Sequence, residues 1–209
     1  MSTDLIHQLY AGLLPWLGLS LLLLGRSPIL SRLRIVGSLL LAFFLLRIPV
    51  HGWNIFLWIR SLEANPSIIM SGLLSVALWQ RVSGRELFRL SDWTAAWIFG
   101  SAAAFTLYPM GLGLTSVDSY CWGWDRGLPI ATAAIATALL LLGNRLGVLL
   151  LLPSAGFFLD LQESRNFWDA LVDPIYAVIS LGAVILLLLR LCTQRQQRVA
   201  SFDKGQTAC

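Results

Sequence analysis

Arg47-Ile-Pro-Val-His51-Gly-Trp-Asn54-Ile-Phe-Leu-Trp58 is the stretch around which the rest of the sequence is arranged. It lies inside a long apolar run from about Ile35 to Ile59. On one continuous helix, positions spaced i, i+4, i+7 and i+11 share a face. The spacing therefore predicts a polar stripe that runs from the middle of a membrane to one surface. Its members are Arg47, His51, Asn54 and Trp58.

The composition of the chain indicates a membrane protein. Of 209 residues, 57% are hydrophobic and only 12% are charged. These values exclude an ordinary soluble domain and a disordered chain. The net charge of +4 does not indicate nucleic-acid binding, because the arginines gather at the ends of apolar runs, where they set membrane topology. Three cysteines without a CxxC pair and two histidines predict neither a metal site nor a cofactor.

Seven apolar runs divide the sequence and predict an all-α bundle of about seven transmembrane helices. They are Leu9–Leu24, Ile35–Ile59, Pro66–Trp79, Trp93–Leu114, Leu128–Leu142, Leu146–Leu159 and Ile175–Leu191. A helix needs about 20 residues to cross a hydrocarbon core of about 30 Å, so the runs at 66–79 and 146–159 are short for a span. One domain is expected over residues 1–192, followed by a basic, disordered tail over 193–209.

The charges of the loops alternate along the chain and predict the topology. Basic loops follow the first, third, fifth and seventh runs, and acidic loops follow the others. The positive-inside rule then places the N-terminus outside and the C-terminus in the cytoplasm. A six-helix alternative, with one short run re-entrant, misplaces at least one basic loop. Arginine used almost to the exclusion of lysine is typical of a GC-rich bacterial genome, so we expect a bacterial inner membrane.

Two smaller features carry structural expectations. The run Gly100–Ala104 contains only small residues and predicts close packing against another helix. Under the predicted topology, Cys121 lies outside while Cys192 and Cys209 lie in the cytoplasm, so no intrachain disulfide is expected.

The outward loops collect carboxylates, amides and aromatic side chains. The candidate binding residues there are Asp118, Tyr120, Trp122, Trp124, Asp125, Asp160, Glu163, Asn166, Trp168, Asp169 and Asp173. One interpretation is an interfacial aromatic belt with solvated acids. The other is a site for a sugar or a lipid headgroup, which carboxylates, amides and flat aromatic rings suit. Neither interpretation outweighs the other.

Arg47 has two interpretations of its own. Its guanidinium group suits an anchor for a phosphate or carboxylate that enters from the outer face. A charge at that depth in a membrane usually pairs with another charge, which favours a structural ion pair. Asp160 is the first candidate partner and Asp173 the second. His51 could relay a proton, but a hydrogen bond within the bundle is the favoured interpretation.

Catalytic motifs are missing from the sequence. It contains no G-x-S-x-G, no H-E-x-x-H and no phosphate-binding G-x-x-x-x-G-K-[ST]. The first hypothesis is therefore a non-catalytic envelope component that binds membrane lipids, a lipid-linked glycan or a larger membrane protein. An enzyme acting on a lipid-linked substrate at the outer leaflet is the alternative, with two loop carboxylates as acid and base. A transporter whose path follows the polar stripe is the second alternative.

Overall fold

The computed structural model describes residues 3–25, 32–63, 65–159 and 161–206. These residues are mostly helical, and their only sheet is a two-stranded hairpin. The predicted all-α class is confirmed.

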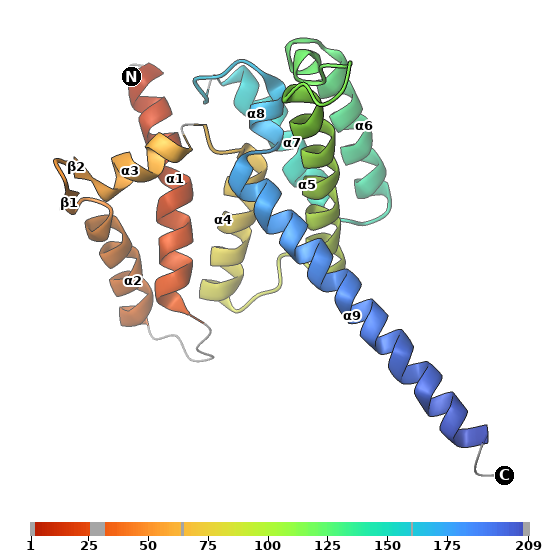
Figure 1. The fold of residues 1–209 in the computed structure, drawn as a ribbon. Coiled ribbons are helices and arrows are strands. Elements are labelled where there is room, and N and C mark those ends of the chain that lie inside the picture. The colour runs from red at the N-terminus through yellow and green to blue at the C-terminus, as the bar shows by residue number, and fades with distance from the viewer. Residues whose placement is uncertain (1–2, 26–31, 64, 160, 207–209) are drawn as a thin grey trace.

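Within the described residues, seven long helices alternate in direction between two ends of the molecule (Figure 1). They are α1 (Thr3–Leu24), α2 (Arg32–Leu45), α4 (Ile68–Ser83), α5 (Leu90–Gly111), α6 (Gly127–Leu141), α7 (Leu146–Phe158) and α9 (Pro174–Gln206). We call the end with the connections 46–67, 112–126 and 159–173 the hairpin end. The end with the connections 84–89 and 142–145 is the arginine end.

The predicted helix over residues 35–59 is wrong. Helix α2 ends at Leu45, and strands β1 (Pro49–Val50) and β2 (Trp53–Asn54) form an antiparallel hairpin before α3 (Ile55–Leu62) begins. Pro49 lacks the N–H that a helix needs, and Gly52 adopts a φ of 84° in the turn. The run predicts one helix because it is continuously apolar, but these two residues instead favour a turn after α2.

The other helix boundaries lie close to the predicted runs, with one exception. Helix α9 continues to Gln206, so the tail predicted to be disordered is helical over most of its length. The tail contains no proline, and its arginine, glutamine and alanine residues favour helix. Two short elements lie in the loops of the hairpin end: the 3-10 helix η1 (Tyr120–Trp124) and helix α8 (Phe167–Leu171).

Helices α5 and α9 pack in direct contact through the small residues predicted for this purpose. A Cβ atom added to Gly100 would lie 2.3 Å from Ser180 Oγ and 2.6 Å from Tyr176 Cζ. The Tyr176 hydroxyl also donates to the Ala96 carbonyl at 2.6 Å. The backbones approach closely because glycine leaves room for the tyrosine ring, which confirms the packing role of this patch.

Two buried aspartates tie helix starts together at opposite ends of the bundle. Asp173 accepts hydrogen bonds from the backbone N–H groups of Ser67 (2.7 Å) and Tyr176 (2.6 Å), and so joins the starts of α4 and α9. Asp92 accepts from the N–H groups of Arg89 (2.8 Å) and Arg145 (3.0 Å), and so joins α5 to α7. A carboxylate at a helix N-terminus satisfies free donors and complements the helix dipole.

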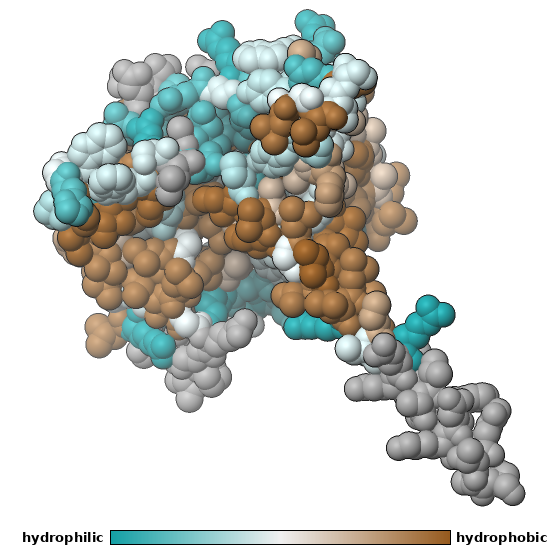
Figure 2. All heavy atoms as spheres, viewed as in Figure 1, coloured by the Kyte–Doolittle hydropathy of each residue, from teal (hydrophilic) through white to brown (hydrophobic). Residues whose placement is uncertain are grey.

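Two helical segments, Leu5–Leu24 and Pro174–Arg195, are long and apolar enough to cross a membrane. Helices α4, α6 and α7 are apolar but shorter. In the 18-residue window of each of these two segments, 22% and 17% of the residues are buried within the protein. Figure 2 shows a broad hydrophobic band across the viewed face, with hydrophilic residues gathered at the hairpin end.

Candidate functional site

Arg47 lies at the hairpin end rather than in the middle of a helix. It is exposed in the turn that follows α2, and its guanidinium carbon lies 5.1 Å from the centre of the Phe43 ring. Asp160, its first expected partner, lies outside the described residues. Asp173, the second, is 2% exposed and binds backbone N–H groups instead. The predicted pair with Asp173 is therefore wrong, because the helix break at Pro49 carries Arg47 to the surface.

The other three residues of the predicted stripe have local roles in the hairpin and α3. His51 is exposed in the hairpin turn with a φ of 51°. Asn54 caps α3 by accepting the Leu57 N–H at 2.8 Å. The Trp58 indole donates to the Val50 carbonyl at 2.9 Å. No shared helix face exists, so the stripe is corrected to a set of turn and cap residues.

Asn166 and Trp168 hold the two loops of the hairpin end together. The Asn166 amide donates to the Tyr120 carbonyl at 3.0 Å, and the Trp168 indole donates to the Ser119 carbonyl at 2.8 Å. Both side chains are buried, with exposed fractions of 1% and 4%. Gly123 is required beside them, because a Cβ there would lie 1.7 Å from Asn166 Oδ1. These two candidates position the loops.

Three of the predicted residues are exposed on η1 and its C-terminal cap. They are Trp122, Trp124 and Asp125. Their surface position fits either an interfacial belt or contact with a partner.

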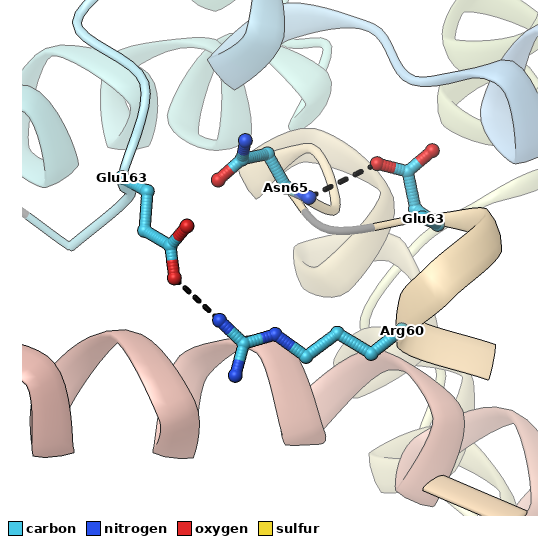
Figure 3. Close-up of polar contacts among 4 residues, drawn as sticks. All are labelled: Arg60, Glu63, Asn65 and Glu163. Atoms are coloured by element: carbon cyan, nitrogen blue, oxygen red, sulfur yellow. Dashed lines mark hydrogen bonds and ion pairs between the residues drawn. The ribbon is translucent and has the colours of Figure 1, made fainter. Parts of the chain in front are cut away.

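Glu163 pairs with Arg60 of α3 and connects that helix to the loop before α8 (Figure 3). Glu63, one turn beyond Arg60, takes no part in this pair. Its carboxylate accepts the Asn65 N–H at 3.2 Å, and Figure 3 shows it turned toward Asn65, apart from Glu163. The two glutamates thus have separate environments.

A cavity of about 510 Å³ opens at the hairpin end, between the segment after α3, the end of α5, η1 and the start of α9. Its lining residues are Glu63, Asn65, Leu107, Tyr108, Gly111, Leu112, Asp118, Tyr120, Asp169, Val172, Asp173 and Pro174. Four of these are acids and none is basic. The cavity brings together the predicted residues Asp118, Tyr120, Asp169 and Asp173 from two loops far apart in sequence.

The electrostatics of this cavity follow from its burial and its acids. Burial raises the pKa of Glu63 to about 7, and the neighbouring Asp173 contributes in the same direction. The Tyr120 hydroxyl donates to Asp169 Oδ2 at 3.3 Å, and burial together with Asp169 raises the pKa of Tyr120. Near neutral pH the cavity therefore has acceptor oxygens and net negative charge, which attract cations and hydrogen-bond donors and repel phosphate.

Three polar lining residues were not among the predicted binding residues: Glu63, Asn65 and Tyr108. The only signals for them were a glutamate in the short segment between two apolar runs and a tyrosine directly before Pro109. Neither signal shows that these positions meet. Among the described residues, no group of three or more His, Cys, Asp and Glu side chains is arranged to hold a metal ion.

Comparison of the chain with protein-family models, curated proteins and solved structures gives no match.

Proposed function

We propose that the chain is a multi-pass protein of the bacterial inner membrane, in which α1, α2, α4, α5, α6, α7 and α9 cross the bilayer. The hairpin end faces outward and the arginine end faces the cytoplasm. The alternating helix directions and the arginines at the connections 84–89 and 142–145 support this orientation. The connection between α2 and α4 is an exception to the charge rule, because it carries Arg47 and Arg60 outward.

The shorter helices fit a bilayer that is thin around the protein. Helices α2, α4, α6 and α7 have 14, 16, 15 and 13 residues. At 1.5 Å per residue they extend about 20–24 Å, less than a typical core of about 30 Å. Local thinning accommodates such a mismatch at modest cost.

The function that the geometry supports best is non-catalytic binding of a lipid headgroup or glycan in the acidic cavity. One observation carries this proposal: the cavity has four carboxylates and no basic side chain among its lining residues. Acceptor oxygens beside the rings of Tyr108 and Tyr120 suit a ligand that presents amine or hydroxyl donors. A ligand that enters through its phosphate is disfavoured by the same charges.

Purification in mild detergent, followed by mass spectrometry of the co-purifying lipids and glycans, tests the proposal. The double variant Glu63→Gln, Asp169→Asn should lose the ligand, since a hydrogen bond to a charged group contributes about 1.5–3 kcal/mol and each 1.4 kcal/mol is about tenfold in affinity. Asp125→Asn is the matched control, because Asp125 is exposed and lies outside the cavity lining. Equal ligand content in all three proteins would overturn the proposal.

A protein partner is the other occupant that this purification would reveal. Trp122 and Trp124 are 45% and 64% exposed, and exposed aromatic side chains are enriched in interfaces. A co-purifying protein released by Trp124→Ser, with the lipid content unchanged, would assign this surface to the partner.

Catalysis on a lipid-linked substrate is the second candidate function. The Glu63 pKa of about 7 is near that of an efficient general acid or base, and Asp118 and Asp169 line the same cavity. An enzyme would convert a bound substrate during incubation, whereas a binding protein would return it unchanged. The transporter hypothesis rested on the polar stripe and is not pursued, because that stripe does not form.

A further inference from the structure

A second, apolar cavity runs along the bundle between α1 and the helices α4 and α9. Its volume is about 660 Å³. Residues from α1, α3 and α9 that line it include Leu14, Gly18, Leu22, Ile55, Ile59 and Ile175. We call this cavity the apolar groove. Its lining is aliphatic, so it suits hydrocarbon rather than water or a polar chain.

Residues that line the apolar groove and residues that line the acidic cavity are near neighbours at two places in the chain. On α3, Ile59 lines the groove and Glu63, one turn later, lines the acidic cavity. At the start of α9, Pro174 lines the acidic cavity and Ile175 lines the groove. Figure 2 shows hydrophilic surface at the hairpin end directly above hydrophobic surface on the viewed face. An occupant of both spaces must therefore be polar at its outer end and apolar along its length.

The lining of the groove suits an acyl chain. The stretch from Leu14 to Leu22 covers about 12 Å of α1 at 1.5 Å per residue. Along this length the groove is lined by residues of α1, α3, α4 and α9 and, among the described residues, presents no polar side chain. A hydrocarbon chain matches this lining.

We infer that the ligand of the acidic cavity is an amine-bearing lipid, whose ammonium group lies among the carboxylates and whose acyl chain lies in the apolar groove. This inference rests on the proposed function, since it names the ligand class for the same cavity. Charge complementarity sets the headgroup: Glu63, Asp118, Asp169 and Asp173 line the cavity without a basic side chain. The apolar groove sets the tail, because its lining suits an acyl chain.

Phosphatidylethanolamine is the probe, and its binding to the detergent-purified full chain is measured by native mass spectrometry. Gly18→Trp fills the groove, because Gly18 lines it and a Cβ atom there meets nothing within 4 Å. Gly182→Trp is the matched control: it too is a helical glycine with open space at its Cβ, and it lies outside the groove lining. We expect Gly18→Trp to weaken binding tenfold or more and Gly182→Trp to leave it unchanged. Gly18→Leu, a smaller substitution, should act in the same direction if the tryptophan variant does not fold.

The outcomes separate the inference from the proposed function. Loss of phosphatidylethanolamine in Gly18→Trp and in the double variant Glu63→Gln, Asp169→Asn supports both. Loss in the double variant alone overturns the acyl-chain placement and leaves headgroup binding intact. Phosphatidylglycerol, which has no amine, should bind at least tenfold more weakly to the unaltered chain, and equal binding would overturn the headgroup assignment. Unchanged binding in every variant would overturn both proposals.

Discussion

The body of the molecule, α4 to α9, is packed more tightly than the N-terminal unit, α1 to α3. In the body, a Cβ added to Gly100, Gly147 or Gly156 would lie 2.3, 2.5 or 2.2 Å from its nearest neighbour. In the N-terminal unit, the same addition at Gly18 or Gly37 meets nothing within 4 Å. These three glycines permit close approach between elements of the body, although Gly182 of α9 faces open space as Gly18 and Gly37 do. The buried core cluster also lies almost wholly in the body, with Leu14 its one buried member from α1 to α3 among the described residues.

This difference in packing indicates where the molecule has space for a ligand. The N-terminal unit is held to the rest of the chain by contacts that include the Tyr10 hydroxyl bond to the Pro66 carbonyl at 2.8 Å and the Arg60–Glu163 pair. The apolar groove lies along the boundary between this unit and the body. The closely packed body supplies most of the acidic cavity for a headgroup. The apolar groove, at the boundary with the less closely packed N-terminal unit, supplies space for an acyl chain.

The largest expected effect tests how strongly the body depends on its buried caps. Asp173→Ala leaves two backbone N–H groups without their acceptor and should lower the free energy of unfolding by about 3–6 kcal/mol, since each such bond to a charged group contributes about 1.5–3 kcal/mol. Asn54→Ala removes the cap of α3 in the N-terminal unit and should cost only about 1 kcal/mol. Thermal unfolding in detergent measures both. Equal losses would erase the contrast between the two regions.

The next effect compares two glycines directly. Gly100→Ala forces a Cβ against Ser180 and Tyr176, so it should destabilise the protein by about 1–3 kcal/mol. Gly37→Ala, in the interior of α2, meets open space and should stabilise by up to about 1 kcal/mol through helix propensity. Opposite signs in the same unfolding assay are expected. A neutral Gly100→Ala would show that α5 and α9 can move apart.

Glu63 lies at the boundary between the N-terminal unit and the body, and its ionisation makes the stability of the fold depend on pH. Its pKa is raised by burial from 4.5 to about 7 in the folded protein, so the unfolded chain ionises first and folded stability falls as pH rises from about 4.5 to 7. Glu63→Gln should therefore raise the melting temperature at pH 8 and leave it unchanged at pH 4.5. Binding of an amine ligand to the unaltered chain should strengthen as pH rises through 7. A pH-independent difference in melting temperature would contradict this role.

Arg47 gives the smallest expected effect. Its side chain is exposed, and the contact with the Phe43 ring contributes about 0.5–1 kcal/mol at such a site. Arg47→Ala should therefore lower stability by no more than about 1 kcal/mol. A loss of 3 kcal/mol or more, as expected for a broken buried pair, would return Arg47 to the interior of the bundle.

Much of the fold could be predicted from the sequence, because the positions of the helices depend on the local pattern of apolar and charged residues. Long apolar runs separated by charged loops place the helices within a few residues, and small residues such as Gly100 mark a close contact. The helix break near Pro49 was missed because hydrophobicity does not distinguish a bent helix from a helix, a turn and a second helix. Arg47 was misplaced for the same reason.

The candidate site was predictable only in part. Asp118, Tyr120, Asp169 and Asp173 could be assigned to one end of the molecule from topology. Their meeting with Glu63 depends on contacts between segments more than 50 residues apart, which no local pattern specifies. The sequence alone also does not show that Asn166 and Trp168 are buried between loops, because their residue types suit a binding surface equally well.

The most direct test of the account is whether the acidic cavity faces outward. Cys121 is exposed beside the cavity, and Cys192 is exposed near the C-terminal end of the apolar segment Pro174–Arg195 of α9, so each reports one side. The Cys121 thiol donates to Asp118 at 3.1 Å, and Asp118 raises the pKa of Cys121, so labelling is best done above pH 8. An impermeant maleimide should label intact cells that carry the Cys192→Ser, Cys209→Ser variant. It should label cells that carry Cys121→Ser, Cys209→Ser only after permeabilisation. The reverse pattern would place the cavity in the cytoplasm and contradict the account.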